Sequence, residues 1–531
     1  MTTTLLRNGE VHSPADPFAT ALLVDGGVVA WVGSEGAAEA HADGVDEVVD
    51  LAGALVTPAF VDAHVHATAT GLALTGLDLS GTSSLAECLA AVERHGRAVR
   101  GGAVLGHGWD ETRWPEGRPP TREELDRASY GGVVYLTRID VHSSVVSSAL
   151  LAAAPGVRAE AGYADSGHLT RDAHHAARRL ALDTLSESQR REAQRATRTR
   201  AAELGIGLLH EMAGPEVSSA QDLALLLELA AAEPGPDVVG YWGEPGGVER
   251  ARELGALGAA GDLFVDGAIG SRTAALRQVY ADADTSGHRY LTAGQVRDHV
   301  VACTRAGLQA GFHAIGDAAM DAVVAGLREA LAEVGPAAMR AGRHRVEHAE
   351  MLDADHLAGF VETGAVASVQ PVFDALWGGE DGMYAQRLGV ERAMTLNPFA
   401  ALAAAGVPLA FGSDAPVTPL GPWEAVRAAA FHHDPAQRLS ARAAFAAHTR
   451  GGWRAVRRDD AGVLVPGAPA SYAVWEVGEL VVQAPDDRIQ AWSTDPRSGT
   501  PGLPDLTPGV AAPRCLRTVV HGQTVFDAGS L

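Results

Sequence analysis

Two histidines at the end of an apolar stretch are the first sign of chemistry in this chain. Residues 58–66 read PAFVDAHVH, so His64 and His66 are two positions apart. In a β-strand that spacing places both imidazoles on one face. Two neutral imidazoles held by one rigid strand form half of a divalent metal site. An isolated His-x-His is a weak signal, and two incidental histidines in a structural strand are the ordinary alternative.

Other histidines and a carboxylate follow short apolar stretches later in the chain. His313, His348 and Asp414 each end such a stretch. In a barrel of parallel strands, the carboxyl ends of the strands meet at one mouth, where active sites are built. One such coincidence carries little weight, but residues of these types at four strand ends indicate a shared site.

The elements that must position these residues follow an α/β pattern. The middle of the chain alternates short apolar stretches with helical stretches rich in Ala and Leu. This alternation is typical of a parallel α/β barrel. We expect eight strands, ending near His66, Asp140, Glu211, Gly267, His313, His348, Gln370 and Asp414. The sequence therefore predicts a TIM-like (β/α)₈ barrel over residues 57–455.

Both ends of the chain consist of short apolar stretches separated by turns. In residues 22–33 two such stretches are joined by an Asp-Gly step, which is a hairpin signal. Residues 1–56 are too few for a sandwich of their own, and residues 456–531 have the same character. We expect the two ends to pair into one small β-sandwich.

Residues 67–132 are too long for an ordinary connection between a strand and a helix. We interpret them as an insertion in the barrel that acts as a lid or binds substrate. Trp109 is a candidate for lining the substrate pocket, and the alternative is a tryptophan in the core of the lid. Residues 143–205, with a charged helix expected over 186–204, are assigned to the same cover.

Composition and charge restrict the function classes. The 531 residues include 66 acidic and 42 basic side chains, a formal net charge of −24, which opposes binding to nucleic acid or to an anionic membrane. No apolar run approaches the roughly 20 residues of a membrane span, and the N-terminus lacks the apolar core of a signal peptide. Three widely spaced cysteines suit free thiols. We expect a cytoplasmic protein with a small-molecule substrate, and we leave homo-oligomerisation open.

The chain resembles the amidohydrolase superfamily of metal-dependent hydrolases. More narrowly, it resembles amidohydrolase family 3, the branch that includes N-substituted formamide deformylase. The resemblance covers nearly the whole chain and is carried by residues 264–274 (FVDGAIGSRTA), 313–317 (HAIGD) and 413–416 (SDAP). These motifs are specific for the family and are poor guides to the substrate.

The resemblance implies that His64, His66, His313, His348 and Asp414 are the metal and catalytic set. Imidazoles and a carboxylate suit Zn²⁺ or a similar divalent ion. A metal with an open position activates water at neutral pH. Asp414 would orient that water, accept its proton and pass it to the leaving nitrogen. His348 would bind a second metal or polarise the scissile carbonyl.

The chain departs from its relatives in having no lysine: all 42 basic residues are arginine. Relatives commonly carry a lysine five residues before Gly267, where a carbamylated lysine could bridge two metals, and this chain has Asp262 there. Either the site holds one ion, which we favour, or a carboxylate (Asp262, Asp266 or Glu211) takes the place of the bridge. The alternative for Asp262 is a solvent-facing position at the start of a strand.

Two further residues are candidates for substrate binding. His142 lies in residues 138–143 (RIDVHS), which match a family pattern, and it either contacts substrate or packs. Arg272 could clamp an anionic group of the substrate, although the turn that holds it could be structural only.

The leading function is hydrolysis of a non-peptide C–N bond in an amide, formamide or cyclic amide. Deamination of an aromatic amine is the runner-up, and a lactone or ester remains open because the metal centre is indifferent to the leaving group. The rival from another class is a non-catalytic protein that keeps the fold for metal binding or regulation. The absence of lysine gives that rival some support, while the histidine-rich pocket argues against it.

Overall fold

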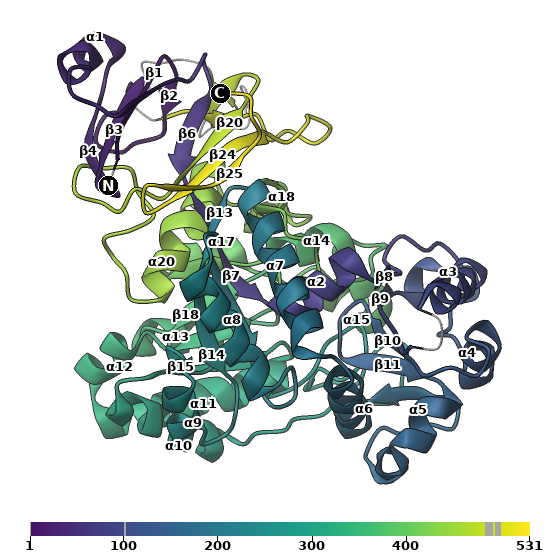
Figure 1. Ribbon diagram of the computed structural model, residues 1–531. Helices are drawn as coiled ribbons and strands as arrows, with labels where there is room; N and C mark the ends of the chain where they lie inside the picture. Colours follow the sequence, from purple (N-terminus) through teal and green to yellow (C-terminus); the bar gives the residue numbers. More distant parts are fainter. Residues whose placement is uncertain (1, 100–101, 484–491, 494–500) are drawn as a thin grey trace.

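A sheet of eight parallel strands forms the centre of the computed structural model (Figure 1). The order of the strands in the sheet is the same as their order along the chain. An isolated bridge between Val65 and Ala415 brings the two edges of the sheet together. The sheet is therefore a nearly closed barrel, which confirms the predicted (β/α)₈ fold. Its strands are β7 (Phe60–Val65), β13 (Ile206–Ala213), β14 (Asp237–Trp242), β15 (Gly258–Ala259), β16 (Gln309–Ala314), β17 (Arg345–His348), β18 (Val366–Val369) and β19 (Leu409–Phe411).

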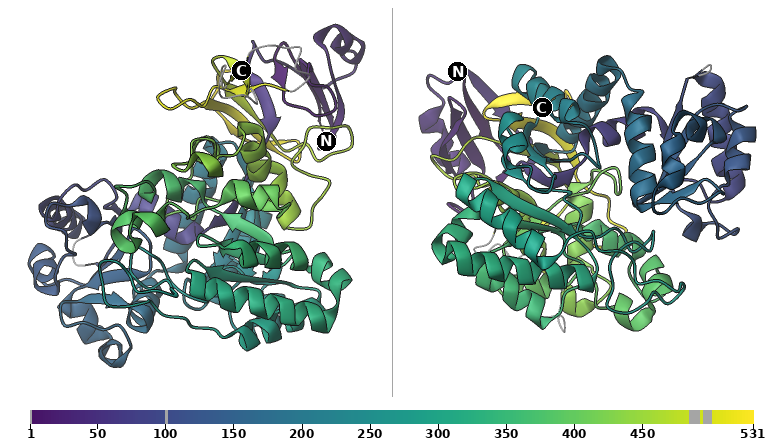
Figure 2. Two further views of the ribbon diagram at one scale, coloured as in Figure 1. Left: turned by 180° about the vertical axis from the view of Figure 1, so that it is seen from behind. Right: turned by 90° about the horizontal axis from the view of Figure 1, so that it is seen from below.

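Helices cover the outside of the barrel (Figure 2). The sequence sets their ends: α10 begins with a capping box of Thr292 and Gln295 and stops at Gly307, whose φ of 73° breaks the helix. The structure describes residues 2–99, 102–483, 492–493 and 501–531, and within these ranges no helix is long and apolar enough to cross a bilayer. The helices include α2 (Ala67–Thr75), α7 (Glu187–Glu203), α8 (Ala220–Ala232), α9 (Val248–Glu253), α10 (Ala293–Ala306), α11 (Asp317–Val334), α13 (Ala354–Thr363), α14 (Pro371–Trp377), α15 (Met383–Leu388), α17 (Phe399–Ala404) and α18 (Pro422–Ala430).

The two ends of the chain pair into a small β-domain, as predicted, with strands from both ends side by side in Figure 1. Leu6 and Leu22 from the first end share one buried core with Tyr472 and Val519 from the second. One sheet has the order β4-β3-β1-β5 and the other β2-β6-β20-β24-β25. Their strands are β1 (Thr3–Arg7), β2 (Glu10–Val11), β3 (Ala21–Asp25), β4 (Val28–Gly33), β5 (Glu47–Asp50), β6 (Leu55–Pro58), β20 (Tyr472–Glu476), β24 (Arg514–Val520) and β25 (Gln523–Asp527).

A separate lobe is inserted between β7 and β13 (Figure 1). It has its own five-stranded sheet, in the order β12-β11-β10-β9-β8, and its own apolar core. The lobe reaches Asp183, so it joins most of residues 67–132 with the first part of residues 143–205, which the sequence assigned to the same cover. Its elements are β8 (Leu77–Asp78), α3 (Leu85–Ala98), β9 (Val104–Trp109), α4 (Arg122–Ala128), β10 (Val134–Arg138), β11 (Ser143–Val146), α5 (Ser148–Ala153), β12 (His168–Thr170) and α6 (Arg171–Asp183).

Two of the expected barrel strands need correction. The strand expected to end at Asp140 is β10, which belongs to the sheet of the inserted lobe. Its place in the barrel is taken by β14, which the sequence reading did not identify. The strand expected to end at Gly267 is β15, which stops at Ala259, and Phe264 beyond it forms only an isolated bridge with His313. Asp262 therefore follows the end of its strand and does not lie at the start.

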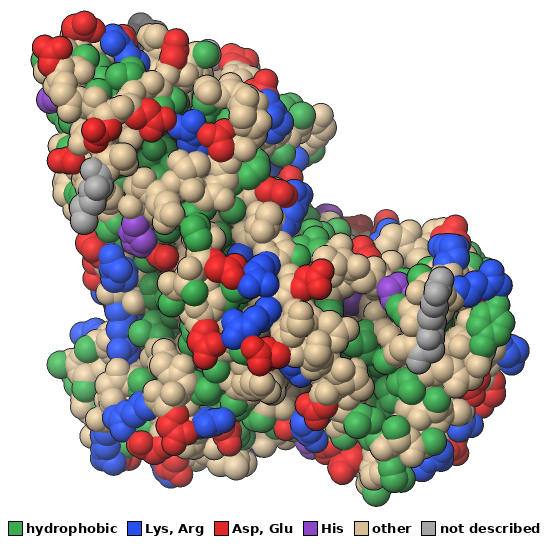
Figure 3. All heavy atoms as spheres, in the orientation of Figure 1, with side chains coloured by type: hydrophobic (Ala, Val, Ile, Leu, Met, Phe, Trp, Pro, Cys, Tyr) green, Lys and Arg blue, Asp and Glu red, His purple; other side chains and the backbone are tan. Residues whose placement is uncertain are grey.

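A buried ion cluster fastens the inserted lobe to the barrel. Arg138 of β10 donates to Glu111 and Asp140, and Arg387 of α15 donates to Glu111 and Asp282. Because both arginines are buried, these charges must be paired to remain inside the protein. On the face drawn in Figure 3, acidic and basic side chains alternate and form no continuous basic surface.

Candidate metal centre

The five residues expected to form the site come together at the carboxyl-terminal mouth of the barrel. His64 lies in β7 and His66 directly follows it, His313 lies in β16, His348 ends β17, and Asp414 follows β19. All five side chains are buried. Residues as far apart in the chain as His64 and Asp414 therefore line one small volume.

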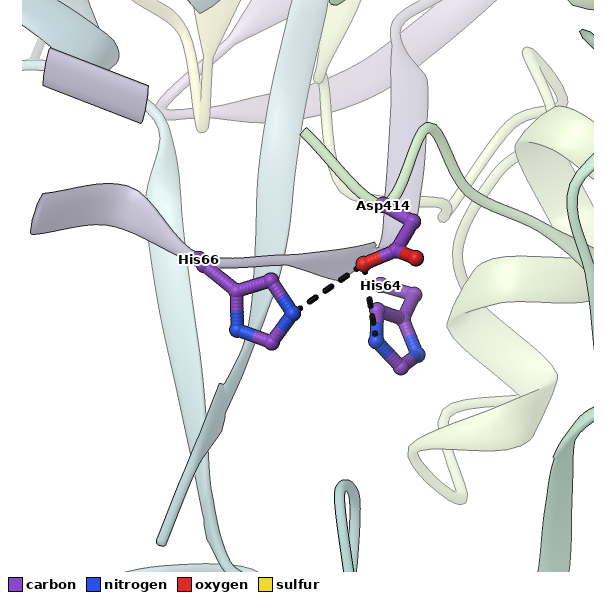
Figure 4. A group of neighbouring side chains, drawn as sticks. All are labelled: His64, His66 and Asp414. Atoms are coloured by element: carbon purple, nitrogen blue, oxygen red, sulfur yellow. Dashed lines mark hydrogen bonds and ion pairs between the residues drawn. The ribbon is translucent and has the colours of Figure 1, made fainter. Parts of the chain in front are cut away.

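Asp414 faces both histidines of the first strand, as Figure 4 shows. Its Oδ1 atom lies 3.0 Å from His66 Nε2 and 3.4 Å from His64 Nε2. Two imidazole nitrogens and a carboxylate oxygen that all lie within 4.8 Å of one another form a group that could hold a metal ion.

Asp262 lies at the centre of the same cluster. Its Oδ2 atom is 3.2 Å from His66 Nε2, and its Oδ1 atom is 3.5 Å from His64 Nε2 and 3.4 Å from His313 Nδ1. His348 Nε2 is 3.9 Å from the same Oδ1. The solvent-facing alternative for Asp262 is therefore wrong, because this side chain is only 7% exposed.

A buried ion pair fixes the imidazole of His64. His64 Nδ1 donates to Glu347 Oε2 at 2.9 Å, and Arg345 donates to both oxygens of Glu347 at 2.5 and 2.9 Å. Since Nδ1 is held by Glu347, Nε2 faces the cluster. Burial opposes ionisation of Glu347, but the Arg345 charge outweighs it and lowers the pKa of Glu347 to about 2.

The other three imidazoles are oriented in the same way. Each has one ring nitrogen within reach of an oxygen outside the cluster, so that its second nitrogen is free to face inward. The contacts are His66 Nδ1 with Met212 O (3.1 Å), His348 Nδ1 with Gln370 Oε1 (2.8 Å) and His313 Nε2 with Gly267 O (3.4 Å). Four histidines therefore direct one ring nitrogen each at one volume.

Several inward-facing atoms have no hydrogen-bond partner among the described residues. They are His64 Nε2, His313 Nδ1, His348 Nε2 and Asp262 Oδ1, each almost completely removed from solvent. Buried polar atoms are normally satisfied, so a convergent set of unsatisfied acceptors calls for a cation. Imidazoles with carboxylates are ligands for Zn²⁺ and similar divalent ions, and the residues present therefore fit such an ion.

Without an ion, the charges of the cluster perturb one another. Burial opposes ionisation of Asp262 and Asp414, but the surrounding histidines outweigh it and hold both pKa values below the usual range. Burial also opposes protonation of His66 and His348, yet the two carboxylates raise the pKa of His66 well above normal and that of His348 to about 9. The cluster thus attracts positive charge, whether protons or metal ions.

The backbone around Asp414 is held against β7. Asp62 Oδ1 accepts a hydrogen bond from Ser413 N at 2.9 Å, and Asp414 N donates to His64 O at 2.8 Å. At Gly412 a Cβ atom would lie 2.5 Å from His64 N, so only glycine permits this close approach. These contacts fix the carboxylate beside the two histidines.

The cluster forms the floor of a cavity of about 100 Å³ between the barrel and the inserted lobe. Its walls come from α2, from β9 and β10 of the lobe, and from α6. Most of the wall is apolar, including Leu72, Leu77, Leu105, Tyr135, Leu182 and Phe264. The inserted lobe therefore completes the pocket above the candidate metal centre.

His142 lies on the wall of this cavity, next to the cluster. Its ring centre is 4.9 Å from that of His313 and 5.2 Å from that of Phe264. Burial and the neighbouring His313 lower the pKa of His142 well below its ordinary value, so the imidazole is neutral. Its position agrees with a contact to substrate, which stays a prediction.

The other two candidates for substrate contact, Trp109 and Arg272, are held by structural partners, which was the alternative given for each. Trp109 is fully buried in the core of the inserted lobe, and its indole nitrogen donates to Leu136 O at 3.0 Å. Arg272 makes a two-pronged pair with Asp282 at 2.9 and 2.7 Å. Neither side chain lines the cavity above the cluster, because each is committed to a structural partner.

The sequence reading missed several residues around the site. Glu347 and Gln370 both orient imidazoles. Glu347 directly precedes His348, and Gln370 ends a predicted strand; these positions are the only signal in the sequence. His107, which lies between two glycines in the sequence, is on the cavity wall and contacts Pro416 O at 2.8 Å. Arg178 of α6 also lines the cavity, and no sequence pattern marks it.

Several known proteins are similar to this chain over most of its length. The chain is 29% identical to Protein LONG AFTER FAR-RED 3 of Arabidopsis thaliana, over 88% of this chain and 86% of that protein. It is 26% identical to N-substituted formamide deformylase of Arthrobacter pascens, over 76% and 79% of the two chains. The crystal structure of an uncharacterized metal-dependent hydrolase from Pyrococcus furiosus superposes with a TM-score of 0.70 at 28% identity, covering 89% of this chain and 98% of that one.

The match to the family model spans nearly the whole chain, including the barrel, the inserted lobe and most of the small β-domain. It runs over residues 47–526. The structural neighbours include metal-dependent hydrolases, and the match to the family model means that the chain belongs to the Amidohydrolase family.

Proposed function

We propose that this protein hydrolyses a non-peptide C–N bond, in an amide, formamide or cyclic amide, with the help of a divalent metal ion. The observation that supports this most is the set of four buried imidazoles with inward-facing ring nitrogens beside Asp414, at the floor of a mainly apolar cavity. An ion with a purely structural role needs no adjacent cavity, because protein side chains can fill all of its coordination positions. The family relationship supports the hydrolase class.

Asp414 is the residue that we assign to proton transfer. It borders the cavity, and its lowered pKa keeps it ionised at neutral pH, as a base must be. When bound, a divalent ion would lower the pKa of water and polarise the carbonyl group of the substrate. Asp414 accepts the proton of the attacking water as the new C–O bond forms. It then donates this proton to the nitrogen as the C–N bond breaks.

The cavity favours a neutral substrate. Arg178 is the cation on its wall, and its guanidinium already donates to Val141 O and to Glu216 O, the latter at 3.1 Å. A carboxylate on the substrate would face mainly apolar side chains and would lose its hydration without a partner. An amide with an apolar substituent fits these walls. His142, neutral and adjacent, is available as a hydrogen-bond partner.

The test is turnover of a panel of N-formyl and N-acyl amines by purified, metal-loaded protein. The panel includes aromatic amines and lactones, because release of ammonia or of a hydroxy acid would redirect the proposal to those substrates. Asp414→Asn keeps the shape but not the base, so kcat should fall by about 10²–10⁴. The exposed Asp43 offers a matched control, and Asp43→Asn should leave kcat unchanged. A metal-free protein without turnover on any compound would refute the proposal.

A further inference from the structure

Three buried carboxyl groups lie at or near the histidine cluster and are the candidates for a carboxylate in place of a lysine. These are Asp262, Asp266 and Glu211, and they differ in what their oxygen atoms contact. A carboxylate that replaces the lysine must have oxygens free to face the histidines. One whose oxygens are already used by the backbone has a structural role.

Asp266 and Glu211 are already engaged by backbone N–H groups. Burial raises the pKa of Asp266 to about 7 and that of Glu211 to about 8. These two side chains hold loops together at the mouth of the barrel. Asp266 accepts from Ala275 N (2.8 Å), Ile315 N (3.0 Å) and Gly316 N (2.8 Å), and Glu211 Oε2 accepts from Ala67 N (2.7 Å).

Asp262 instead meets the histidines with both oxygens. Oδ2 faces His66 at 3.2 Å, on the side of the cluster that contains Asp414. Oδ1 faces His313 at 3.4 Å and His348 at 3.9 Å on the other side, and it has no hydrogen-bond partner among the described residues. His64 Nε2 lies between the two sides, 3.5 Å from Oδ1 and 3.4 Å from Asp414 Oδ1. Ligands about 2.0–2.1 Å from one ion lie roughly 3.0–3.4 Å apart, so these spacings are close to those of ligand atoms.

The backbone places Asp262 at this point rigidly. Gly243, which follows β14, packs directly on it, since a Cβ atom on Gly243 would lie 2.7 Å from the carbonyl carbon of Asp262. A short aspartate therefore reaches the centre of the cluster from a backbone held at close range.

We propose that Asp262 binds two divalent ions, one through each carboxylate oxygen, and so replaces the lysine-derived bridge that this chain lacks. One ion would have His64, His66 and Asp414 as its other ligands, and the second would have His313 and His348. This inference rests on the proposed function for the presence of metal. It departs from the single ion that we favoured from the sequence, because the two oxygens of Asp262 lie within reach of different histidines, Oδ2 of His66 and Oδ1 of His313.

The experiment measures metal content and affinity. The protein is stripped with a chelator, reloaded with Zn²⁺ and analysed by inductively coupled plasma mass spectrometry. Wild-type protein should take up two ions per chain. Asp262→Ala and Asp262→Asn should take up no more than one tightly, with at least about 100-fold weaker binding of the other. Loading with Mn²⁺ provides a second readout, because a carboxylate-bridged pair gives a spin-coupled electron paramagnetic resonance signal that the variants should lose.

Glu211→Gln is the matched control, because its amide oxygen still accepts from Ala67 N. This variant should keep both ions and the coupled signal. Circular dichroism of each metal-free variant checks that the fold is retained. Saturation of the wild type at one ion, or two ions bound with unchanged affinity by Asp262→Ala, overturns the bridge. Catalysis by a one-ion wild type would leave the proposed function standing while refuting the bridge.

Discussion

Replacing Glu347 by glutamine separates two roles that this residue plays beneath the metal centre. Glu347 and Arg345 are both fully buried, and Glu347 also accepts the Nδ1 proton of His64. Glutamine keeps the shape and one acceptor oxygen but removes the negative charge. The change leaves a buried arginine without its counter-charge and weakens the group that orients a candidate metal ligand.

The magnitude of the stability loss follows from the buried pair. Removing one partner of a buried ion pair costs about 3–5 kcal/mol, because the remaining charge stays desolvated. The pKa of Glu347 gives a similar figure: a value of about 2 in place of 4.5 corresponds to roughly 3 kcal/mol of preference for the ionised form. For comparison, Arg305 and Glu333 form an exposed pair at 2.7 Å, and Glu333→Gln should cost less than about 1 kcal/mol.

The pH dependence has a definite sign. A carboxyl group whose folded pKa lies below its unfolded pKa stabilises the protein above the unfolded value, and this contribution is lost as the pH falls through the folded value. Glu347 therefore contributes fully above about pH 4.5 and loses its contribution toward pH 2. The difference between wild type and Glu347→Gln should shrink as the pH is lowered from 7 to 3.

The assay combines urea unfolding with competition for Zn²⁺ against a chelator. Glu347→Gln should unfold at lower urea and bind Zn²⁺ about 10–100-fold more weakly, as expected for loss of a group that orients a ligand. The double variant Arg345→Met with Glu347→Leu removes both charges, so it should regain stability but not Zn²⁺ affinity. If Glu347→Gln matches Glu333→Gln in both measurements, the reasoning about the buried pair is refuted.

Two more predictions concern the loops beside the cluster. Burial raises the pKa of Glu211 to about 8, so its contribution to stability is present below about pH 4.5 and is lost as the pH rises through 8. Glu211→Gln, which cannot ionise, should exceed the wild type in unfolding free energy by on the order of a few kcal/mol at pH 9. Urea unfolding at pH 5 and pH 9 measures this, and an equal pH dependence for the two proteins would contradict it. Gly412→Ala places a methyl group against His64 N, so we expect a loss of about 1–3 kcal/mol and Zn²⁺ binding at least about 10-fold weaker. Gly36→Ala, where the space is open, is the control and should leave Zn²⁺ affinity unchanged.

Much of the fold was predictable because its signals are local. The alternation of buried strands and helices, the Asp-Gly hairpin near the N-terminus and the capping residues of the helices each depend on neighbours in the chain. His64 and His66 were found in the same way, since a spacing of two on a strand fixes a shared face.

The membership of strands in sheets was not predictable in this way. Residues 134–138 and residues 237–242 are both short apolar stretches, yet the first lies in the inserted lobe and the second in the barrel. A buried strand has the same apolar pattern in either sheet. Only its neighbouring strands, which are distant in the chain, show which sheet it belongs to. The sequence left Trp109 between a pocket wall and a lobe core for the same reason, because a tryptophan looks alike in sequence in either place, and the structure places it in the lobe core.

The sequence by itself determined which atoms are available for chemistry here: histidines and carboxylates at strand ends, and no lysine anywhere in the chain. Only the tertiary structure decided how those atoms are used. The fold directs the side chain of Asp262 toward the histidine cluster, whereas Asp266 and Glu211 accept hydrogen bonds from backbone N–H groups. It also places Glu347 within hydrogen-bond distance of His64. The physical reason is that composition fixes the donors and acceptors, whereas their pairing depends on distances that exist only after distant strands have closed into a barrel.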